Sequence, residues 1–136
     1  MTTDTALLDF TITPNAHPMA EAERLKAFEN LGFGTLFTDH MTVIQWDIDK
    51  GWHSAEVKAR APFQIDPAAS VLHYAQEIFE GMKAYRTPDG RITLFRPEEN
   101  ARRFNKSAAR MAMPDVPEDL FLKAVEELVK IDAKWV

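Results

Sequence analysis

The segment from residue 82 to residue 95 has the sequence of a β-hairpin, and this feature restricts the folds open to the chain. Thr87-Pro88-Asp89-Gly90 is a turn sequence, because proline presets the backbone, aspartate bonds within its own turn and glycine takes the left-handed conformation. The turn separates Met82–Arg86 from Arg91–Phe95. We therefore expect two neighbouring antiparallel strands here.

Two helices are expected after the hairpin. Pro97 suits the first turn of a helix, where a missing N–H costs nothing, and Pro114 and Pro117 stop that helix and start the next. Apolar residues recur at three- and four-residue steps in both segments: Ala101, Phe104, Ala108 and Met111, then Leu120, Ala124, Leu128 and Ile131. Each helix is thus expected to bury one apolar stripe.

The first half of the chain predicts an arm, a helix and a pair of strands. Residues 1–18 contain two prolines and several threonines and are expected to be irregular, whereas Ala20–Glu29 has helix-forming composition. Residues 36–46 are rich in β-branched and aromatic residues, which favours a strand. A second strand is expected after the turn at Asp49-Lys50-Gly51.

These elements predict an α+β fold with a mostly antiparallel sheet and helices packed on it. After the loop at residues 62–70, a short helical turn is expected within residues 71–76. We divide the chain into an N-terminal arm and helix, residues 1–30, and a small α+β domain, residues 31–136.

Composition excludes several classes of site. The chain has no cysteine, so disulfides, thiolate zinc sites and cysteine nucleophiles are absent. Its four histidines lie far apart in sequence without metal-ligand spacing, so we expect structural roles for them and no metal site. The start lacks the pattern of a signal peptide and no segment has the length of a membrane helix, so we expect a cytoplasmic protein without membrane partners.

Basic residues are concentrated between Arg86 and Arg110, where seven basic residues stand against three acidic ones. The whole chain has a net charge of -5. A basic island in an acidic protein favours a local anion site, and it argues against nucleic acid as a partner.

Five polar residues of this region fall on one stripe of the expected helix: Arg96, Asn100, Arg103, Ser107 and Arg110. Spacing alone favours a solvated face on which Glu99 pairs with Arg103 and Glu98 with Arg102. In the alternative interpretation, one of the arginines donates a forked pair of hydrogen bonds to a phosphate.

Aromatic residues surround Gly81 in the segment before the hairpin. Tyr74, Phe79 and Tyr85 are ordinary candidates for core packing, but a glycine between aromatic side chains also lets a ligand approach the backbone. Lys83 follows on the expected strand, where its ammonium reaches either a carboxylate or water. Spacing and composition leave both alternatives open.

Several ordered motifs resemble one enzyme family. The longest reads LHYAQEIFEGMKAYR over Leu72–Arg86, and Gly32–Met41 upstream reads GFGTLFTDHM. The motifs FRP, NARRF and SAAR follow within Phe95–Arg110. In this order they resemble branched-chain amino acid aminotransferases, which are class IV, fold-type IV pyridoxal-phosphate enzymes. The resemblance covers nearly the whole chain from about residue 30 onward.

The resemblance implies roles for particular residues. Arg103 corresponds to the arginine that grips the phosphate of pyridoxal 5'-phosphate, which replaces the solvated-face interpretation for this residue. Phe33, Tyr74 and Phe79 correspond to walls of the pocket for the branched side chain. Gly81 corresponds to a position where the backbone nears the bound substrate.

The resemblance also implies a homodimer, since the tyrosine matching Tyr74 serves across a subunit interface in this family. Lys83 matches a basic position close to that tyrosine. The small-molecule partners implied are amino acids and 2-oxo acids. The reaction implied is reversible amino transfer between leucine, isoleucine or valine and 2-oxoglutarate.

One family feature has no counterpart here. The lysine that binds the cofactor covalently lies in a second, larger domain of these enzymes, and none of the eight lysines of this chain has a matching context. We therefore expect this chain to be the small N-terminal domain of a longer enzyme, with no catalytic residue of its own and no activity alone.

Two alternatives remain. The first keeps the fold and changes the reaction, since related class IV enzymes include a D-amino acid aminotransferase and an aminodeoxychorismate lyase, although the long motif argues against both. The second is a non-catalytic ligand-binding or interaction module. Continuation of the reading frame into a lysine-bearing domain would eliminate the module.

Overall fold

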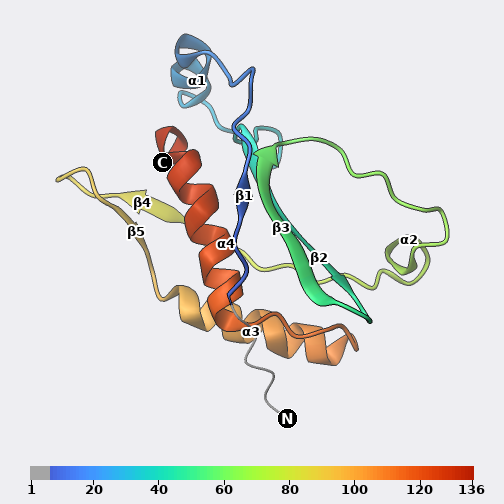
Figure 1. Cartoon of the computed structure of the whole chain (residues 1–136). Coiled ribbons are helices and arrows are strands. Elements are labelled where there is room, and N and C mark those ends of the chain that lie inside the picture. Colours follow the sequence, from blue (N-terminus) through green and yellow to red (C-terminus); the bar gives the residue numbers. More distant parts are fainter. Residues whose placement is uncertain (1–6) are drawn as a thin grey trace. The chain divides into compact units, whose positions relative to one another are not determined.

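The structure is a computed structural model that describes residues 7–136 (Figure 1). Two compact units are present, one formed by Met1–Ala61 with Val125–Val136 and the other by Pro62–Ala124. Helices and small sheets make up the chain, so the expected α+β class is confirmed. The division between an arm and a domain at residue 30 stays a prediction. No helix within residues 7–136 is long and apolar enough to cross a membrane.

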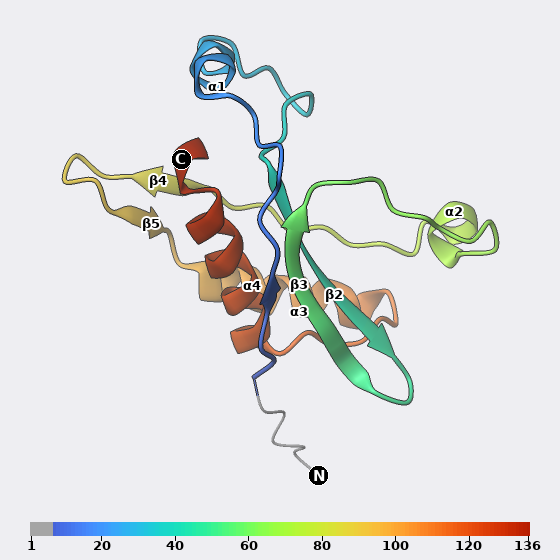
Figure 2. The ribbon, with the colours of Figure 1, turned by 45° about the horizontal axis from the view of Figure 1, so that its top comes forward.

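The first unit contains a three-stranded sheet with the order β1-β3-β2. Strands β2 (His40–Asp47) and β3 (Gly51–Ala59) are antiparallel and lie side by side along their length (Figure 2). In the turn between them, the Asp47 carboxylate accepts backbone N–H bonds from Asp49 and Lys50. Both strands were predicted, although β2 begins at His40 rather than at residue 36.

The middle of β3 forms the core of this sheet. Val57 is fully buried and Ala55 is 4% exposed, as expected for alternate residues on one face of a strand. The register with β2 shifts between Val43 and Gln45, opposite a residue of β3, Ser54, that has a φ of 50°. This local irregularity is a β-bulge, which bends the strand.

Strand β1 (Thr11–Ile12) pairs in parallel with Glu56 and Val57 of β3. The N–H of Thr13 continues this pairing by donating to the carbonyl of Val57 at 2.8 Å. The expectation of an irregular arm is therefore wrong for Thr11–Ile12, because the free backbone edge of β3 recruits these residues. Residues 1–6 of the predicted arm lie outside the described residues.

The C-terminal segment completes the first unit. Helix α4 (Glu118–Ile131) begins in the second unit and ends in the first, where it is followed by the short helix η1 (Ala133–Trp135). Trp135 meets Phe28 edge to face, with ring centroids 6.0 Å apart, and its indole N–H donates to Asp39 at 2.8 Å. Phe28 follows α1 (Glu21–Ala27), which lies inside the predicted helix.

A buried pair joins the start of β2 to the residue after α4. The Asp132 carboxylate accepts the backbone N–H of His40 at 3.1 Å, and it lies 2.6 Å from His40 Nδ1. Because the backbone N–H of Asn15 donates to His40 Nε2 at 2.8 Å, the ring proton belongs on Nδ1 and is donated to Asp132. His40 and Asp132 are 9% and 6% exposed.

The second unit contains a short helix, a hairpin and a long helix. Helix α2 (Ser70–Tyr74) matches the predicted helical turn, and strands β4 (Ala84–Arg86) and β5 (Ile92–Leu94) form the predicted antiparallel hairpin. In the turn, the N–H of Thr87 donates to Arg91 at 2.8 Å, and Gly90 has a φ of 85°. Glycine at this position satisfies the left-handed geometry that the turn requires.

Helix α3 (Pro97–Arg110) begins with the proline, as predicted. Ala101 and Ala108 are buried on its inner stripe, and the rings of Phe104 and Phe121 lie 5.4 Å apart. The side chain of Asn105 bonds both the N–H and the carbonyl of Val116. These contacts hold the start of α4 against α3 within the second unit.

The buried pair of the first unit predicts a large effect of Asp132→Ala on stability. Two hydrogen bonds to a carboxylate are lost, and the free energy of unfolding should fall by about 3 kcal/mol. Urea unfolding followed by circular dichroism measures this change. Glu126→Ala, at an exposed position of α4, is the control and should cost less than about 1 kcal/mol. Equal losses in the two variants would contradict the assigned role.

Candidate functional site

An irregular segment of the second unit, residues 76–81, runs along α3 in the opposite direction to the helix. At one end the Gln76 amide donates to the carbonyl of Met111 at 2.9 Å. At the other end the Asn100 amide donates to the carbonyl of Gly81 at 3.1 Å. Asn100 of the polar stripe predicted from spacing therefore holds one end of this segment, and the backbone carbonyl of Met111, the residue after α3, holds the other.

Glu80 is the centre of this arrangement. Its carboxylate accepts bonds from Arg103 Nε at 2.7 Å, from Arg103 Nη2, from the Asn100 amide at 3.2 Å and from the Gly81 N–H at 2.9 Å. The pair with Arg103 is a bidentate fork, the strongest geometry for a guanidinium and a carboxylate. The side chain of Glu80 is 7% exposed, whereas that of Arg103 is 67% exposed.

These bonds shift the ionisation of both groups. Hydrogen bonding from Arg103 lowers the pKa of Glu80 from 4.5 to about 2, because the donors favour the charged carboxylate. The same bond raises the pKa of Arg103. Both side chains are therefore charged over the whole physiological range.

The fork leaves part of Arg103 free for another anion. A guanidinium has five N–H donors, and Glu80 takes the one on Nε and one on Nη2. The remaining donors lie on the far edge of a side chain that is mostly exposed. Arg103 is thus oriented by one carboxylate, while its other N–H groups have no acceptor within residues 7–136.

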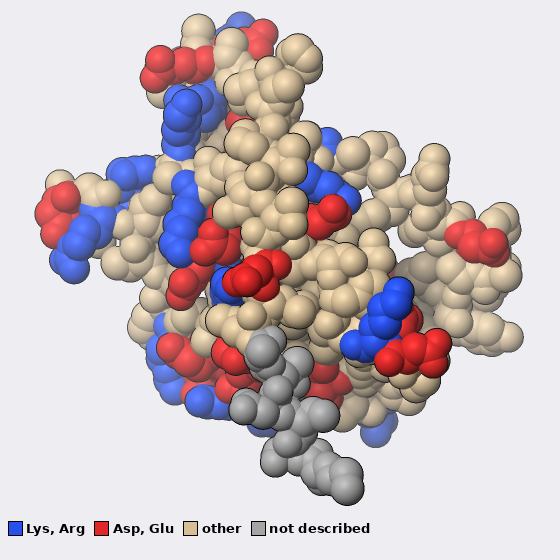
Figure 3. Space-filling view, in the orientation of Figure 1, with Lys and Arg blue, Asp and Glu red and all other residues tan. Residues whose placement is uncertain are grey.

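The other arginines of the basic region do not form the ion pairs that spacing suggested. Glu99 bonds Arg102 at 2.6 Å and Arg96 at 3.4 Å, so it does not pair with Arg103. The prediction of Glu99–Arg103 and Glu98–Arg102 pairs is wrong, because the better-buried carboxylate of Glu80 captures Arg103. Much of the charge in this region is neutralised locally, and basic and acidic side chains lie close together on the face shown in Figure 3.

An open depression of about 480 Å³ lies beside Arg103 in the second unit. Its lining residues come from the 76–81 segment and from α3 and its end: Glu77, Ile78, Arg103, Lys106, Ser107, Arg110 and Met111. Within residues 7–136, neither Lys106 nor Arg110 has a carboxylate partner. The Ser107 hydroxyl donates to the carbonyl of Arg103 at 3.2 Å and so serves the helix. The depression therefore has cationic donors suited to an anion.

The residues predicted to contact substrate are exposed. Tyr74 and Phe79 are 82% and 90% exposed in the second unit, and Phe33, at 99%, belongs to the first unit. Lys83 and Gly81 are also exposed, and a Cβ added at Gly81 would meet nothing within 4 Å. Their roles toward a ligand stay predictions.

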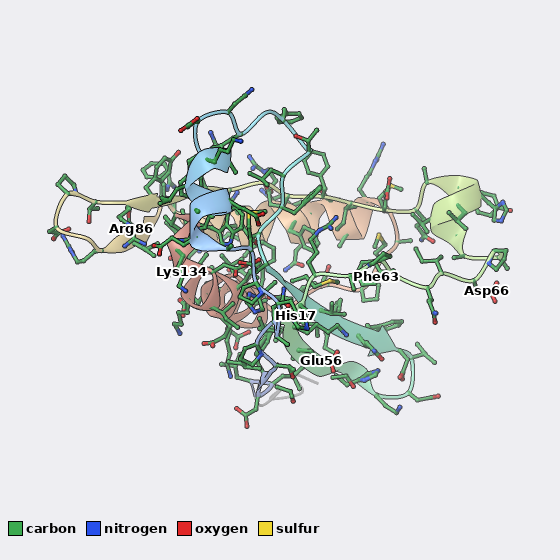
Figure 4. All side chains as sticks on the ribbon, turned by 90° about the horizontal axis from the view of Figure 1, so that it is seen from above. His17, Glu56, Phe63, Asp66, Arg86 and Lys134 are labelled. Carbon is green, nitrogen blue, oxygen red and sulfur yellow. The ribbon has the colours of Figure 1, made fainter. Side chains whose placement is uncertain are left out.

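Exposed aromatic and cationic groups also occur elsewhere in the second unit. Phe63, on the loop before α2, is 65% exposed, and Figure 4 labels it together with Asp66 of the same loop. Figure 4 also labels Arg86 at the hairpin, where its guanidinium donates to the carbonyl of Gly90 at 3.1 Å. Arg86 therefore stabilises the turn.

The first unit has an apolar hollow that sequence reasoning did not find. It measures about 250 Å³ and is lined chiefly by Phe28, Leu31, Phe33, Leu36, Phe37 and Trp135. Trp135 lies at least 97 positions from every other lining residue, so no local pattern could indicate it. The edge-to-face contact between Trp135 and Phe28, which brings Trp135 to this hollow, is visible only in the structure.

Within residues 7–136, the side chains of three histidines have hydrogen-bonding partners. His40 bonds Asp132, His53 lies 2.9 Å from the Asp47 carboxylate, and His73 Nε2 lies 2.6 Å from the carbonyl of Pro67. In the part of the chain that the structure describes, no three histidine, aspartate or glutamate side chains form a group suited to a metal ion.

Comparison with known proteins finds strong similarity to one group. The chain is 51% identical over 125 residues to a probable branched-chain-amino-acid aminotransferase of Streptomyces coelicolor, a match that covers 92% of this chain and 34% of that protein. It is 50% identical over 129 residues to a branched-chain-amino-acid aminotransferase of Mycolicibacterium smegmatis, with 95% and 35% covered. A branched-chain-amino-acid transaminase of Bacillus subtilis is 49% identical over 107 residues, with 79% and 30% covered.

This chain is homologous to the N-terminal third of branched-chain-amino-acid aminotransferases. The resemblance found in its motifs is thereby confirmed. The chain spans about a third of the length of the curated relatives it matches. No protein-family model matches the chain.

In this branched-chain-amino-acid aminotransferase homologue, the Glu80–Arg103 fork predicts a pH dependence of stability. The folded pKa of Glu80, about 2, lies below its ordinary value of 4.5, so its contribution is complete above pH 4.5 and is lost as the pH falls toward 2. The urea midpoint of the parent should fall more steeply in this window than that of Glu80→Gln.

Two other carboxylates make this comparison necessary. Hydrogen bonds from the backbone of Lys50 and from the side chain of Thr87 lower the pKa values of Asp47 and Asp89, respectively. Protonation of Asp47 and Asp89 lowers the stability of the parent and of Glu80→Gln equally. The difference between the two curves of urea midpoint against pH therefore reports the contribution of Glu80. Parallel curves from pH 5 to pH 2 would contradict the assigned ion pair.

Proposed function

We propose that this chain forms the N-terminal domain of a pyridoxal-phosphate-dependent branched-chain aminotransferase. In the complete enzyme it contributes to transfer of the amino group between leucine, isoleucine or valine and 2-oxoglutarate. The match of 51% identity across 92% of the chain carries this proposal, because an alignment of that length includes the segments that hold the candidate site residues.

The residues of the depression fit a cofactor phosphate. A phosphate dianion needs several N–H donors and positive charge, and the free edge of Arg103 with Lys106 and Arg110 offers both. The depression is open and large enough for such a group, at about 480 Å³. We therefore assign Arg103 to the cofactor phosphate.

Pyridoxal phosphate, when bound, supplies the electron sink that lets an amino acid exchange its amino group with a 2-oxo acid. This chain's part is binding and orientation. Arg103 would hold the phosphate of the cofactor through its planar donors, and Lys106 and Arg110 would add positive charge beside it. The lysine that exchanges protons with the substrate belongs, in this proposal, to the second domain of the complete enzyme, so the chain alone is inactive.

The exposed aromatic residues are assigned to the substrate side. Phe33, Tyr74 and Phe79 expose large apolar surfaces, which suit the branched side chains of leucine, isoleucine and valine once a second domain and a partner subunit cover them. Tyr74 is assigned to the subunit interface of a homodimer. Gly81 and Lys83 are assigned to the substrate neighbourhood.

The proposed reaction can be tested with the full natural protein that contains this sequence. With pyridoxal phosphate and 2-oxoglutarate present, L-leucine, L-isoleucine and L-valine should each yield glutamate, measured by a coupled assay. D-Alanine and aminodeoxychorismate should give no product. Preference for either of these two compounds would favour another class IV reaction, and absence of all turnover and of cofactor binding would favour a non-catalytic module.

The assignment of Arg103 predicts a contrast between neighbouring arginines of α3. In the full natural protein, Arg103→Ala should raise the dissociation constant of pyridoxal phosphate by about tenfold or more, because charge-assisted hydrogen bonds are lost. Arg102→Ala should change it less than about threefold, since Arg102 is engaged with Glu99 and Glu118 in exposed ion pairs. Absorbance titration of the cofactor measures both constants. Equal constants would contradict the assignment.

A further inference from the structure

We propose that Glu80 is the positioning residue for Arg103, and that it holds the guanidinium in the orientation in which the free edge meets the cofactor phosphate. This inference rests on the proposed function. It assigns a role to a residue that contacts neither substrate nor cofactor in the proposal.

The first argument is geometric. Arg103 is a long side chain that is 67% exposed, and without a partner it would sample many rotamers. Glu80 takes two parallel N–H bonds, from Nε and Nη2, which fixes both the plane and the rotation of the guanidinium. The donors that remain are the second N–H of Nη2 and the two N–H groups of Nη1.

The second argument is that Glu80 is itself held firmly. The Gly81 N–H and the Asn100 amide bond its carboxylate at 2.9 and 3.2 Å, and its side chain is 7% exposed. Asn100 lies on the same helix as Arg103, three residues earlier. The carboxylate is therefore fixed to the helix that carries the arginine, and the pair forms one rigid unit.

The third argument concerns charge. A carboxylate beside Arg103 cancels much of the arginine's attraction for a phosphate, so a role for Glu80 in attracting the anion is excluded. Lys106 and Arg110, which line the same depression and have no carboxylate partner within residues 7–136, supply the attraction instead. Glu80 thus orients Arg103, whereas Lys106 and Arg110 attract the phosphate.

The positioning role can be tested by whether phosphate binding becomes weaker or tighter when Glu80 is replaced. Glu80→Gln removes a negative charge near the depression, and on electrostatics alone it should tighten phosphate binding. If Glu80 orients Arg103, the variant instead binds more weakly, because the arginine must be ordered by the ligand. The expected rise in the dissociation constant is about threefold to tenfold, the cost of immobilising one long side chain.

Glu77→Gln is the matched control. Glu77 is an exposed acidic residue that lines the same depression and makes no bond to Arg103. Its substitution removes the same charge from the lining of the depression and should tighten cofactor binding slightly, which is the effect of electrostatics alone. Glu80→Asp keeps the charge on a shorter side chain, and its dissociation constant for the cofactor should lie between those of the parent and Glu80→Gln.

The experiment uses the full natural protein and titrates pyridoxal 5'-phosphate by absorbance. The phosphorus-31 resonance of the bound phosphate is recorded for each variant, and it should move toward the free value in Glu80→Gln and stay fixed in Glu77→Gln. Circular dichroism and thermal unfolding identify any variant that is not folded. If Glu80→Gln does not fold, Asn100→Ala, which removes one restraint on Glu80, replaces it and should weaken binding in the same direction.

The outcomes distinguish the positioning role of Glu80 from the assignment of Arg103 to the cofactor phosphate. Weaker binding in both Arg103→Ala and Glu80→Gln supports the positioning role. Weaker binding in Arg103→Ala with equal or tighter binding in Glu80→Gln overturns it and shows that Glu80 competes with the phosphate. Unchanged binding in Arg103→Ala overturns the assignment of Arg103 and the positioning role with it.

Discussion

The contact between Glu80 and Arg103 organises the second unit around the candidate site. Residues 76–81 have no repeating backbone structure, so their position depends on bonds to α3 at both ends. The bidentate fork is the strongest of these bonds, and it places a charged residue of the segment against a charged residue of the helix. The depression beside Arg103 exists because the segment lies along the helix.

The first unit uses the same physical device in a more buried form. Asp132 follows α4 and bonds both the backbone and the ring of His40 at the start of β2, 92 residues away in sequence. Asn15 bonds the other ring nitrogen, so one histidine joins three distant segments. In each unit, one carboxylate that accepts several hydrogen bonds holds a segment without repeating structure to a helix or a strand.

Local elements could be predicted from the sequence because their signals are local. The turn before Arg91 predicted the hairpin, and Pro97 with the apolar stripe of Ala101 and Ala108 predicted α3. The two-residue strand at Thr11–Ile12 was missed, since it is too short to show alternation and forms only because β3 offers a free edge.

The candidate site could be predicted in its residues but not in its contacts. The stripe through Asn100 and Arg103 followed from helical spacing, whereas the partner of Arg103 did not. Spacing favoured Glu99, four residues away, but an exposed pair of that kind contributes only a few tenths of a kcal/mol in an isolated helix. Spacing does not indicate Glu80, because no local rule connects residues 23 positions apart.

An arginine that already binds a carboxylate can still serve a phosphate, because a guanidinium has two usable edges. The edge bonded to Glu80 fixes its plane, and the other edge then offers donors at fixed spacing without a further loss of side-chain entropy. The cost is a weaker net field at Arg103, which the cations at Lys106 and Arg110 offset. A more buried pair could not act in this way, since both edges would be enclosed. The exposure of Arg103, at 67%, beside a carboxylate exposed by only 7%, is therefore the combination that an oriented anion site requires.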